Sequence, residues 1–207
     1  MRGILILLTI LISSISFSQT WDVKIQTVNY TSYFEFDYLS PTVVVYELYK
    51  GGGDCNRDKF RFKNDRKDIK TASDKDYTGS GWDRGHMVSA EDFAYDCYLT
   101  ETTFRFYNCV PQHPSLNRGP WLRVENEVRN LSKTRKIKVM CINIFGNKYL
   151  PNSRVGIPIY CIKLVWDSET RSPIKGWVVN NDSKPRMKVM SHLEIIKRWN
   201  LDIGKFY

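Results

Sequence analysis

The stretch from residue 79 to residue 129 constrains this chain most, because it gathers side chains with catalytic chemistry between apolar positions. Its first half reads Gly-Trp-Asp-Arg-Gly-His-Met from 81 to 87, and its second half runs from Asn108 to Glu125. One of only three histidines in the chain, His86, stands in the first half. We therefore expect the functional chemistry to lie in this stretch.

His86 is the candidate general base, because imidazole is the side chain that titrates nearest neutrality. Arg84, two residues earlier, adds a positive charge that suits an anionic substrate. Gly85 is expected to let the backbone turn sharply, and Gly79 and Gly81 indicate a loop just upstream. Taken alone, these few residues fit equally well a turn with a surface ion pair and an incidental histidine.

The second half has the pattern of an amphipathic helix that begins near Gly119 and Pro120. Glu125 and Arg129 fall one turn apart on its polar face, and Asn117 lies at its N-terminal end. A capping asparagine followed by a solvated Glu–Arg pair would give the same pattern. The apolar positions, spaced by three and four, are Trp121, Val124, Val128 and Leu131.

Together the two halves resemble the DNA/RNA non-specific endonucleases of the ββα-metal class. The matching residues run from Asp76 to Met87 and from Asn108 to Glu125, with weaker likeness over most of the chain beyond residue 18. The resemblance implies an α+β fold, in which a central antiparallel β-sheet with flanking helices carries a ββα-metal active-site element.

The resemblance also implies roles for individual residues. His86 would deprotonate the attacking water, and Asn117 would be the only protein side chain bound directly to the metal. Glu125 would orient metal-bound waters. Arg84 and Arg129 would hold phosphate and stabilise charge in the transition state.

Further positions match supporting or substrate-binding residues of the family: Asp83, Asn108, Gln112 and Trp121. The family has one more functional arginine upstream, for which Arg57, Arg61 and Arg66 all compete. The implied cofactor is Mg²⁺, with Mn²⁺ as an alternative. A hard cation accepts one amide oxygen when substrate phosphate and water complete its ligands, and it can polarise a phosphoryl oxygen.

Residues 1–18 have a basic start, an apolar run and small residues at 16 and 18, which predicts a secretory signal peptide. Residues 19–207 would then form a single endonuclease domain, exported to the periplasm or the medium. No other apolar run approaches the length of a membrane span.

The formal net charge of +9 fits DNA and RNA as substrates, because phosphate contacts dominate non-specific affinity for nucleic acids. Charge alone would fit a heparin-binding or membrane-surface protein equally well. Two alternatives are a catalytically silent relative that binds nucleic acid and a basic secreted protein that binds other polyanions. Homodimers occur in parts of the family, and the sequence carries no signal of one.

Five cysteines lie beyond the predicted signal peptide: Cys55, Cys97, Cys109, Cys141 and Cys161. In an oxidising compartment we expect two disulfides and one free thiol. Cys141 with Cys161, on neighbouring predicted strands, is one candidate pair, and a bridge among the other three would pin the active segment. A zinc site built from Cys97, Cys109 and His113 lacks paired Cys-x2-Cys spacing.

Elsewhere the sequence predicts a helical turn over 89–95 capped by Ser89, and a final helix over 191–200. Ser191 and Glu194 form a capping-box pattern there, which would place His192 on the helix surface. The charged loop 54–76 either faces substrate or is a solvated connection whose phenylalanines pack on the sheet. Strands are predicted over 42–46, 104–110, 137–145, 157–166 and 176–180, with Pro158 at an edge or bulge.

Overall fold

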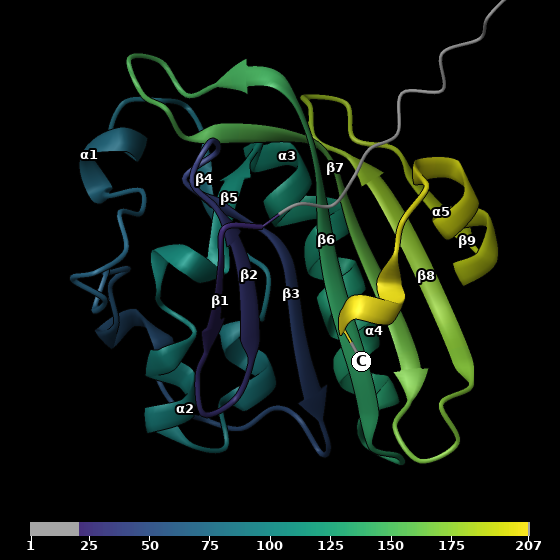
Figure 1. Cartoon of the computed structure of the whole chain (residues 1–207). Helices are drawn as coiled ribbons and strands as arrows, with labels where there is room; N and C mark the ends of the chain where they lie inside the picture. Colours follow the sequence, from purple (N-terminus) through teal and green to yellow (C-terminus); the bar gives the residue numbers. More distant parts are fainter. Residues whose placement is uncertain (1–20, 207) are drawn as a thin grey trace, which may run out of the picture.

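The computed structural model describes residues 21–206, so the predicted signal peptide lies outside the described residues. A seven-stranded antiparallel sheet with the order β1-β2-β3-β6-β7-β8-β9 forms the centre of the molecule (Figure 1). Its strands are β1 (Val23–Gln26), β2 (Thr31–Glu35), β3 (Ser40–Leu48), β6 (Ile137–Tyr149), β7 (Gly156–Asp167), β8 (Pro173–Asn180) and β9 (Met187–Met190).

A second, two-stranded sheet pairs β4 (Asp83–His86) with β5 (Cys109–Gln112). Three consecutive helical segments follow it: α3 (Pro114–Leu116), η4 (Asn117–Trp121) and α4 (Leu122–Leu131). This succession is the expected ββα element, and with the large antiparallel sheet it confirms the predicted α+β class. The remaining segments are η1 (Arg57–Lys59), α1 (Asp74–Tyr77), η2 (Ala90–Phe93), α2 (Cys97–Thr102), η3 (Phe106–Asn108), α5 (His192–Trp199) and η5 (Ile203–Phe206).

Helices cover both faces of the large sheet, and each face has its own core. Val124 and Val128 of α4 pack with Val139 of β6 on one face. Ile195 of α5 packs with Met140 and Ile142 on the other, as the alternation of side chains along a strand requires. In Figure 1, α4 lies behind the sheet and α5 in front of it. The ββα element is thus fixed to the sheet through an apolar interface.

Most predicted strands are confirmed, and several are longer than predicted. Pro158 of β7 pairs with Phe145 of β6 at a shift in the register of these two strands. It precedes the part of β7 that pairs with β8. Both observations confirm the predicted edge or bulge. The prediction of a strand over 104–110 was wrong in its first part. Residues 106–108 form the helical turn η3, and β5 begins only at Cys109.

Two local predictions near helices were also wrong. Ser89 precedes the turn η2, but its side chain makes no capping hydrogen bond. His192 is 7% exposed and packs against Trp166, with 4.4 Å between the ring centroids. The capping box of Ser191 and Glu194 is present, with Ser191 as the N-cap residue directly before α5. None of the helices between residues 21 and 206 is long and apolar enough to cross a membrane.

Candidate active site

The pairing of β4 with β5 sets the positions of the motif residues. His86 lies opposite Cys109, and Asp83 lies opposite Gln112. The expected sharp turn at Gly85 is wrong, since Gly85 is inside β4; the glycines with positive φ nearby are Gly79 (70°) and Gly81 (81°). A Cβ on Gly85 would lie only 2.3 Å from the Oε1 atom of Gln112, so glycine is required there for close packing.

His86 is a buried histidine between two aromatic rings. Only 7% of it is exposed, and its ring lies 4.6 Å from Phe62 and 4.8 Å from Phe104. Its Nε2 atom has no hydrogen-bond partner among the described residues. Burial, together with the charges of Arg57 and Lys163, holds the pKa of His86 well below 6.5. The imidazole is therefore neutral at pH 7 and able to accept a proton.

Two side chains donate hydrogen bonds to the backbone at His86 and Met87. Trp121 Nε1 donates to the carbonyl of His86 at 3.1 Å, and Lys163 Nζ donates to the carbonyl of Met87 at 3.1 Å. Lys163 is fully buried, and its ammonium lies 4.8 Å from the centre of the Trp121 ring. Our reading of the sequence missed Lys163. Its signal is a single charge inside the apolar run Cys-Ile-Lys-Leu-Val of β7.

Glu125 is buried, so the alternative of a solvated Glu–Arg pair on a polar helix face is wrong. Burial raises its pKa to about 7, while the nearby charges of Lys163, Arg129 and Arg57 oppose that rise. Arg129 Nε lies 3.4 Å from an oxygen of Asp92, which is itself fully buried. The helix therefore directs these charges into the molecule, toward the residues that flank His86.

Asn117 has its amide fixed by a carboxylate. Its Nδ2 donates to Asp83 at 2.9 Å, and Arg118 forms an ion pair with the same carboxylate at 2.7 Å. Because Nδ2 is engaged, the amide oxygen is the atom left to bind a ligand. A hard oxygen donor of this kind suits Mg²⁺ or Mn²⁺. The residues present therefore fit the metal that the family implies.

The arginine of the motif, Arg84, lies on the same face of β4 as His86, since alternate residues of a strand share a face. It is ion-paired with Asp74 at 2.7 Å and lies 5.2 Å from the centre of the Tyr77 ring. Its Nε atom is buried and has no partner in the part of the chain that the structure describes. The guanidinium thus keeps one donor that the protein does not use.

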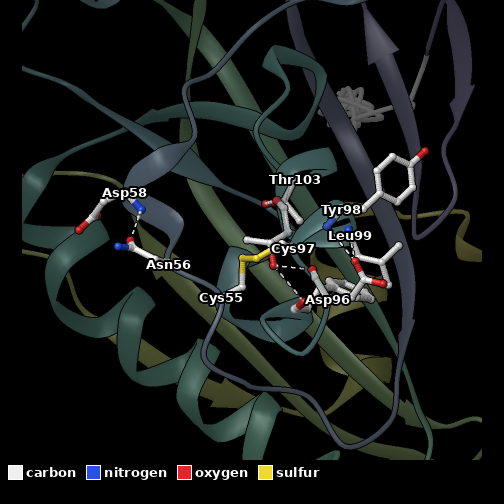
Figure 2. Close-up of a disulfide and its surroundings, with 10 residues drawn as sticks. Cys55, Asn56, Asp58, Asp96, Cys97, Tyr98, Leu99 and Thr103 are labelled. Atoms are coloured by element: carbon white, nitrogen blue, oxygen red, sulfur yellow. Dashed lines mark hydrogen bonds between the residues drawn. A yellow bond between two sulfur atoms is a disulfide. The ribbon is translucent and has the colours of Figure 1, made fainter.

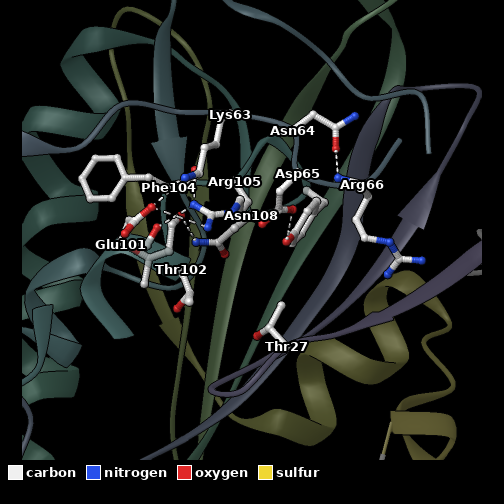
Figure 3. Close-up of polar contacts among 12 residues, drawn as sticks. Thr27, Lys63, Asn64, Asp65, Arg66, Glu101, Thr102, Phe104, Arg105 and Asn108 are labelled. Atoms are coloured by element: carbon white, nitrogen blue, oxygen red, sulfur yellow. Dashed lines mark hydrogen bonds and ion pairs between the residues drawn. The ribbon is translucent and has the colours of Figure 1, made fainter. Parts of the chain in front are cut away.

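Of the three competing upstream arginines, Arg57 is the one near His86. Its guanidinium lies 5.8 Å from the ring of Phe104 and 3.7 Å from Glu91, and its charge lowers the pKa of both His86 and Glu125. Arg61 is tied to the backbone carbonyls of Asp58 and Phe60. Arg66 is paired with Asp68 at 2.7 Å, and Figure 3 shows its guanidinium pointing away from the labelled cluster.

A disulfide anchors the segment that carries Arg57. Cys55, two residues before Arg57, is bonded to Cys97 at the start of α2 (Figure 2). The expectation of a bridge among the cysteines that flank the active segment is confirmed. The predicted pair of Cys141 with Cys161 is wrong: both thiols are free and buried, because Cys141 pairs in register with Lys163 and Cys161 with Asn143. The disulfide also excludes Cys97 as a zinc ligand.

Polar contacts tie the rest of the charged loop to the segment that precedes β5 (Figure 3). Asp65 is paired with Arg105 at 2.5 Å and accepts from the hydroxyl of Tyr107 at 2.9 Å. Lys63 is paired with Glu101 at 2.6 Å. The loop therefore packs on the segment that precedes β5, and its two phenylalanines contact the rings of His86 and Phe104.

Asn108, Gln112 and Trp121 are buried and support the site from inside. The Asn108 side-chain oxygen accepts a hydrogen bond from the backbone N–H of Val88, and its nitrogen donates to the carbonyls of Val88 and Thr103. Both hydrogens of that nitrogen are used, so none remains for substrate. Trp121 is fully buried, so it does not contact substrate.

With this geometry established, the chain can be compared with known proteins. The model of the DNA/RNA non-specific endonuclease family matches residues 14–200. The chain belongs to this family.

Its relatives include mitochondrial endonuclease G of Homo sapiens, 31% identical over 107 residues that make up 52% of this chain and 35% of the relative. Nuclease EXOG of Xenopus laevis is 35% identical over 112 residues, 52% of this chain and 31% of the relative. The salivary endonuclease of Lutzomyia longipalpis is 29% identical over 122 residues, 52% of this chain and 28% of the relative. The matches thus span about a third of the length of these curated relatives.

The fold is similar to that of a chain in the crystal structure of the EndoG/EndoGI complex, described as showing the mechanism of EndoG inhibition. The TM-score is 0.74 at 22% identity, over 88% of this chain and 85% of that one. This likeness supports the α+β architecture.

Proposed function

We propose that the chain is a secreted, Mg²⁺-dependent endonuclease that hydrolyses phosphodiester bonds of DNA and RNA with little sequence specificity. The observation that carries the proposal is the state of His86. Its ring is buried and neutral, and its Nε2 has no partner among the described residues, in a site that also contains the oriented amide of Asn117. A general base needs this combination of a low pKa and a free nitrogen.

In the proposed reaction, His86 accepts a proton from the attacking water. Asn117 would hold the metal through its amide oxygen, while Asp83 keeps that amide in place. When bound, Mg²⁺ would supply positive charge at the phosphoryl and leaving oxygens. Glu125, once ionised, would orient water near the site.

Arginines would bind the scissile phosphate. Arg84 has a donor free in the described structure, and Arg57 places its charge near both His86 and Glu125. Arg129 is held by Asp92 in the same region. Guanidinium groups suit this task because their donors match phosphate oxygens and keep their charge at all relevant pH values.

Export is part of the proposal and is supported by the sequence of residues 1–18, by the Cys55–Cys97 disulfide and by the existence of a salivary relative. We further propose that residues 19–207 act as one nuclease domain. The partners would be DNA and RNA, and the oligomeric state, monomer or homodimer, is open to measurement.

The proposal is tested by incubating the purified protein, without residues 1–18, with supercoiled plasmid and with RNA. Cleavage of both is expected with Mg²⁺ or Mn²⁺ and none with EDTA. If the protein shifts the mobility of plasmid but cuts neither substrate with any divalent cation, the binding-only alternative replaces the enzyme. If neither substrate is cut and heparin competes for the shift as effectively as a DNA duplex of equal charge, a general polyanion-binding role replaces both.

A further inference from the structure

A large groove opens beside the ββα element, at the end of the sheet where β7 and β8 meet α5. Its volume is about 980 Å³. That value is at the upper end of the range of about 300–1,000 Å³ typical of ligand sites. No role in the proposed chemistry has been given to its walls.

Aromatic side chains line part of the groove, and one of them is adjacent in sequence to the residue that orients the candidate metal ligand. Trp82 directly precedes Asp83, the residue that orients Asn117, and its ring meets His113 edge-on at 5.7 Å. Tyr160 of β7 is a half-buried part of the same groove. Both rings are half-buried, and aromatic rings that line a groove can stack nucleobases without reading their identity.

Basic side chains also line the groove. Four exposed cations contribute to it, and none of them forms an ion pair among the described residues: Lys148, Arg186, Lys188 and Arg198. The acidic residue there, Asp182, already accepts hydrogen bonds from the side chain of Asn180 and the backbone of Lys184. Unpaired cations lining a groove favour a nucleic acid, because their contacts with phosphates release the counterions condensed on its backbone.

A buried asparagine fixes the groove relative to the active site. Asn181 Nδ2 donates to the carbonyls of Pro111 in β5 and Pro158 in β7, both at 2.9 Å, and its oxygen accepts from the backbone of His113 at 2.8 Å. The groove and the ββα element therefore share one rigid support.

We infer that this groove binds the single-stranded stretch of nucleic acid next to the cleaved phosphodiester, with bases against the aromatic side chains and phosphates on the cations. The inference rests on the proposed function for the identity of the substrate. The combination of aromatic rings with unpaired cations favours a nucleic acid strand over other polyanions, which carry no bases to stack.

The test measures binding of a fluorescein-labelled 20-nucleotide DNA strand to the protein carrying His86→Ala, so that no cleavage intervenes. The variant Arg186→Glu/Lys188→Glu is expected to weaken binding by at least about 10-fold at moderate salt. The matched control is Arg135→Glu/Arg171→Glu, which makes the same change in charge at exposed positions by the opposite end of the β7–β8 hairpin. An abasic strand of equal length should bind more weakly than the normal strand.

Equal losses in the groove variant and in the control would overturn the inference, as would equal affinity for the abasic and normal strands. These readouts do not depend on catalysis. If the wild-type protein cuts no substrate, the proposed function fails while the binding measurement still decides the role of the groove. If the wild type cuts plasmid and the groove variant binds like the control, only the groove inference fails.

Discussion

The ammonium nitrogen of Lys163 lies 3.1 Å from the carbonyl oxygen of Met87, the residue that follows the candidate base His86. This lysine is fully buried, and it is the foremost cation that opposes the raised pKa of Glu125. It therefore links the β7 strand of the large sheet both to the backbone of the motif and to the protonation of the site.

Replacing Lys163 by methionine keeps the volume but removes the charge. The pKa of Glu125 should then rise above about 7, because less positive charge opposes desolvation. We expect the acid limb of the pH profile of kcat/KM to move up by roughly one unit. The control is Lys175→Met on β8, a half-buried lysine paired with Glu127 outside the site. An unchanged limb in the Lys163 variant would show that the buried charge does not act on Glu125.

The buried Glu125 should also lower stability at high pH. Its pKa in the folded protein is about 7, against an ordinary value of 4.5, so between these pH values the folded state binds more protons than the unfolded state. Stability must then fall as pH rises through this window. The gain in unfolding free energy from Glu125→Gln should grow by roughly 2 kcal/mol between pH 5 and pH 8. Urea unfolding of the wild type and the variant, with EDTA at both pH values, measures this gain in unfolding free energy. The same gain at both pH values would contradict the raised pKa of Glu125.

Asp83 is expected to act on the metal through Asn117. Asp83→Ala frees the Asn117 amide to rotate, so the Mg²⁺ concentration needed for half-maximal cleavage should rise by about 10–100-fold. Arg118→Ala is the control, because it removes the other partner of Asp83 and keeps the hydrogen bond to Asn117. Titrating Mg²⁺ in a plasmid-nicking assay compares the two. Identical requirements in both variants would mean that the hydrogen bond does not position the ligand.

The disulfide should stabilise the loop that carries Arg57. Cys55 and Cys97 are separated by 42 residues. A loop of that length gives a loss of about 4 kcal/mol on removing the bridge. Cys55→Ser/Cys97→Ser should therefore unfold at lower urea concentration and bind nucleic acid less tightly. Cys109→Ala, which removes a free buried thiol, is the matched control for the binding measurement. Tight binding by the bridge variant would show that Arg57 needs no anchor.

The sequence predicted the parts of this molecule in which local pattern and tertiary packing agree. The apolar positions of 121–131 predicted the buried face of α4, and Trp121, Val124 and Val128 are fully buried there. The capping box at Ser191 correctly predicted the start of α5, because it is a local pattern formed by two residues three positions apart in the sequence. The two motif halves located the ββα element by resemblance to the family.

The remaining features depend on contacts between distant segments. Glu125 has the spacing of a solvated residue, and only the packing of α4 against the sheet buries it. His192 is buried for the same kind of reason, by Trp166 of β7. The pairing of Cys141 and Cys161 failed because the register of β6 and β7, which the sequence leaves open, places neither opposite the other. Lys163 was missed because a single charged residue in a strand does not indicate which residues of other segments its side chain contacts.

The central claim is that His86 is the general base, and the rate of plasmid nicking by His86→Ala tests it most directly. His192→Ala is the comparison, because it removes another buried histidine far from the motif. With both variants shown to be folded by thermal unfolding, we predict a loss of at least about 100-fold for His86→Ala and nearly full activity for His192→Ala. Nicking by His86→Ala within a few-fold of the wild-type rate would contradict the account.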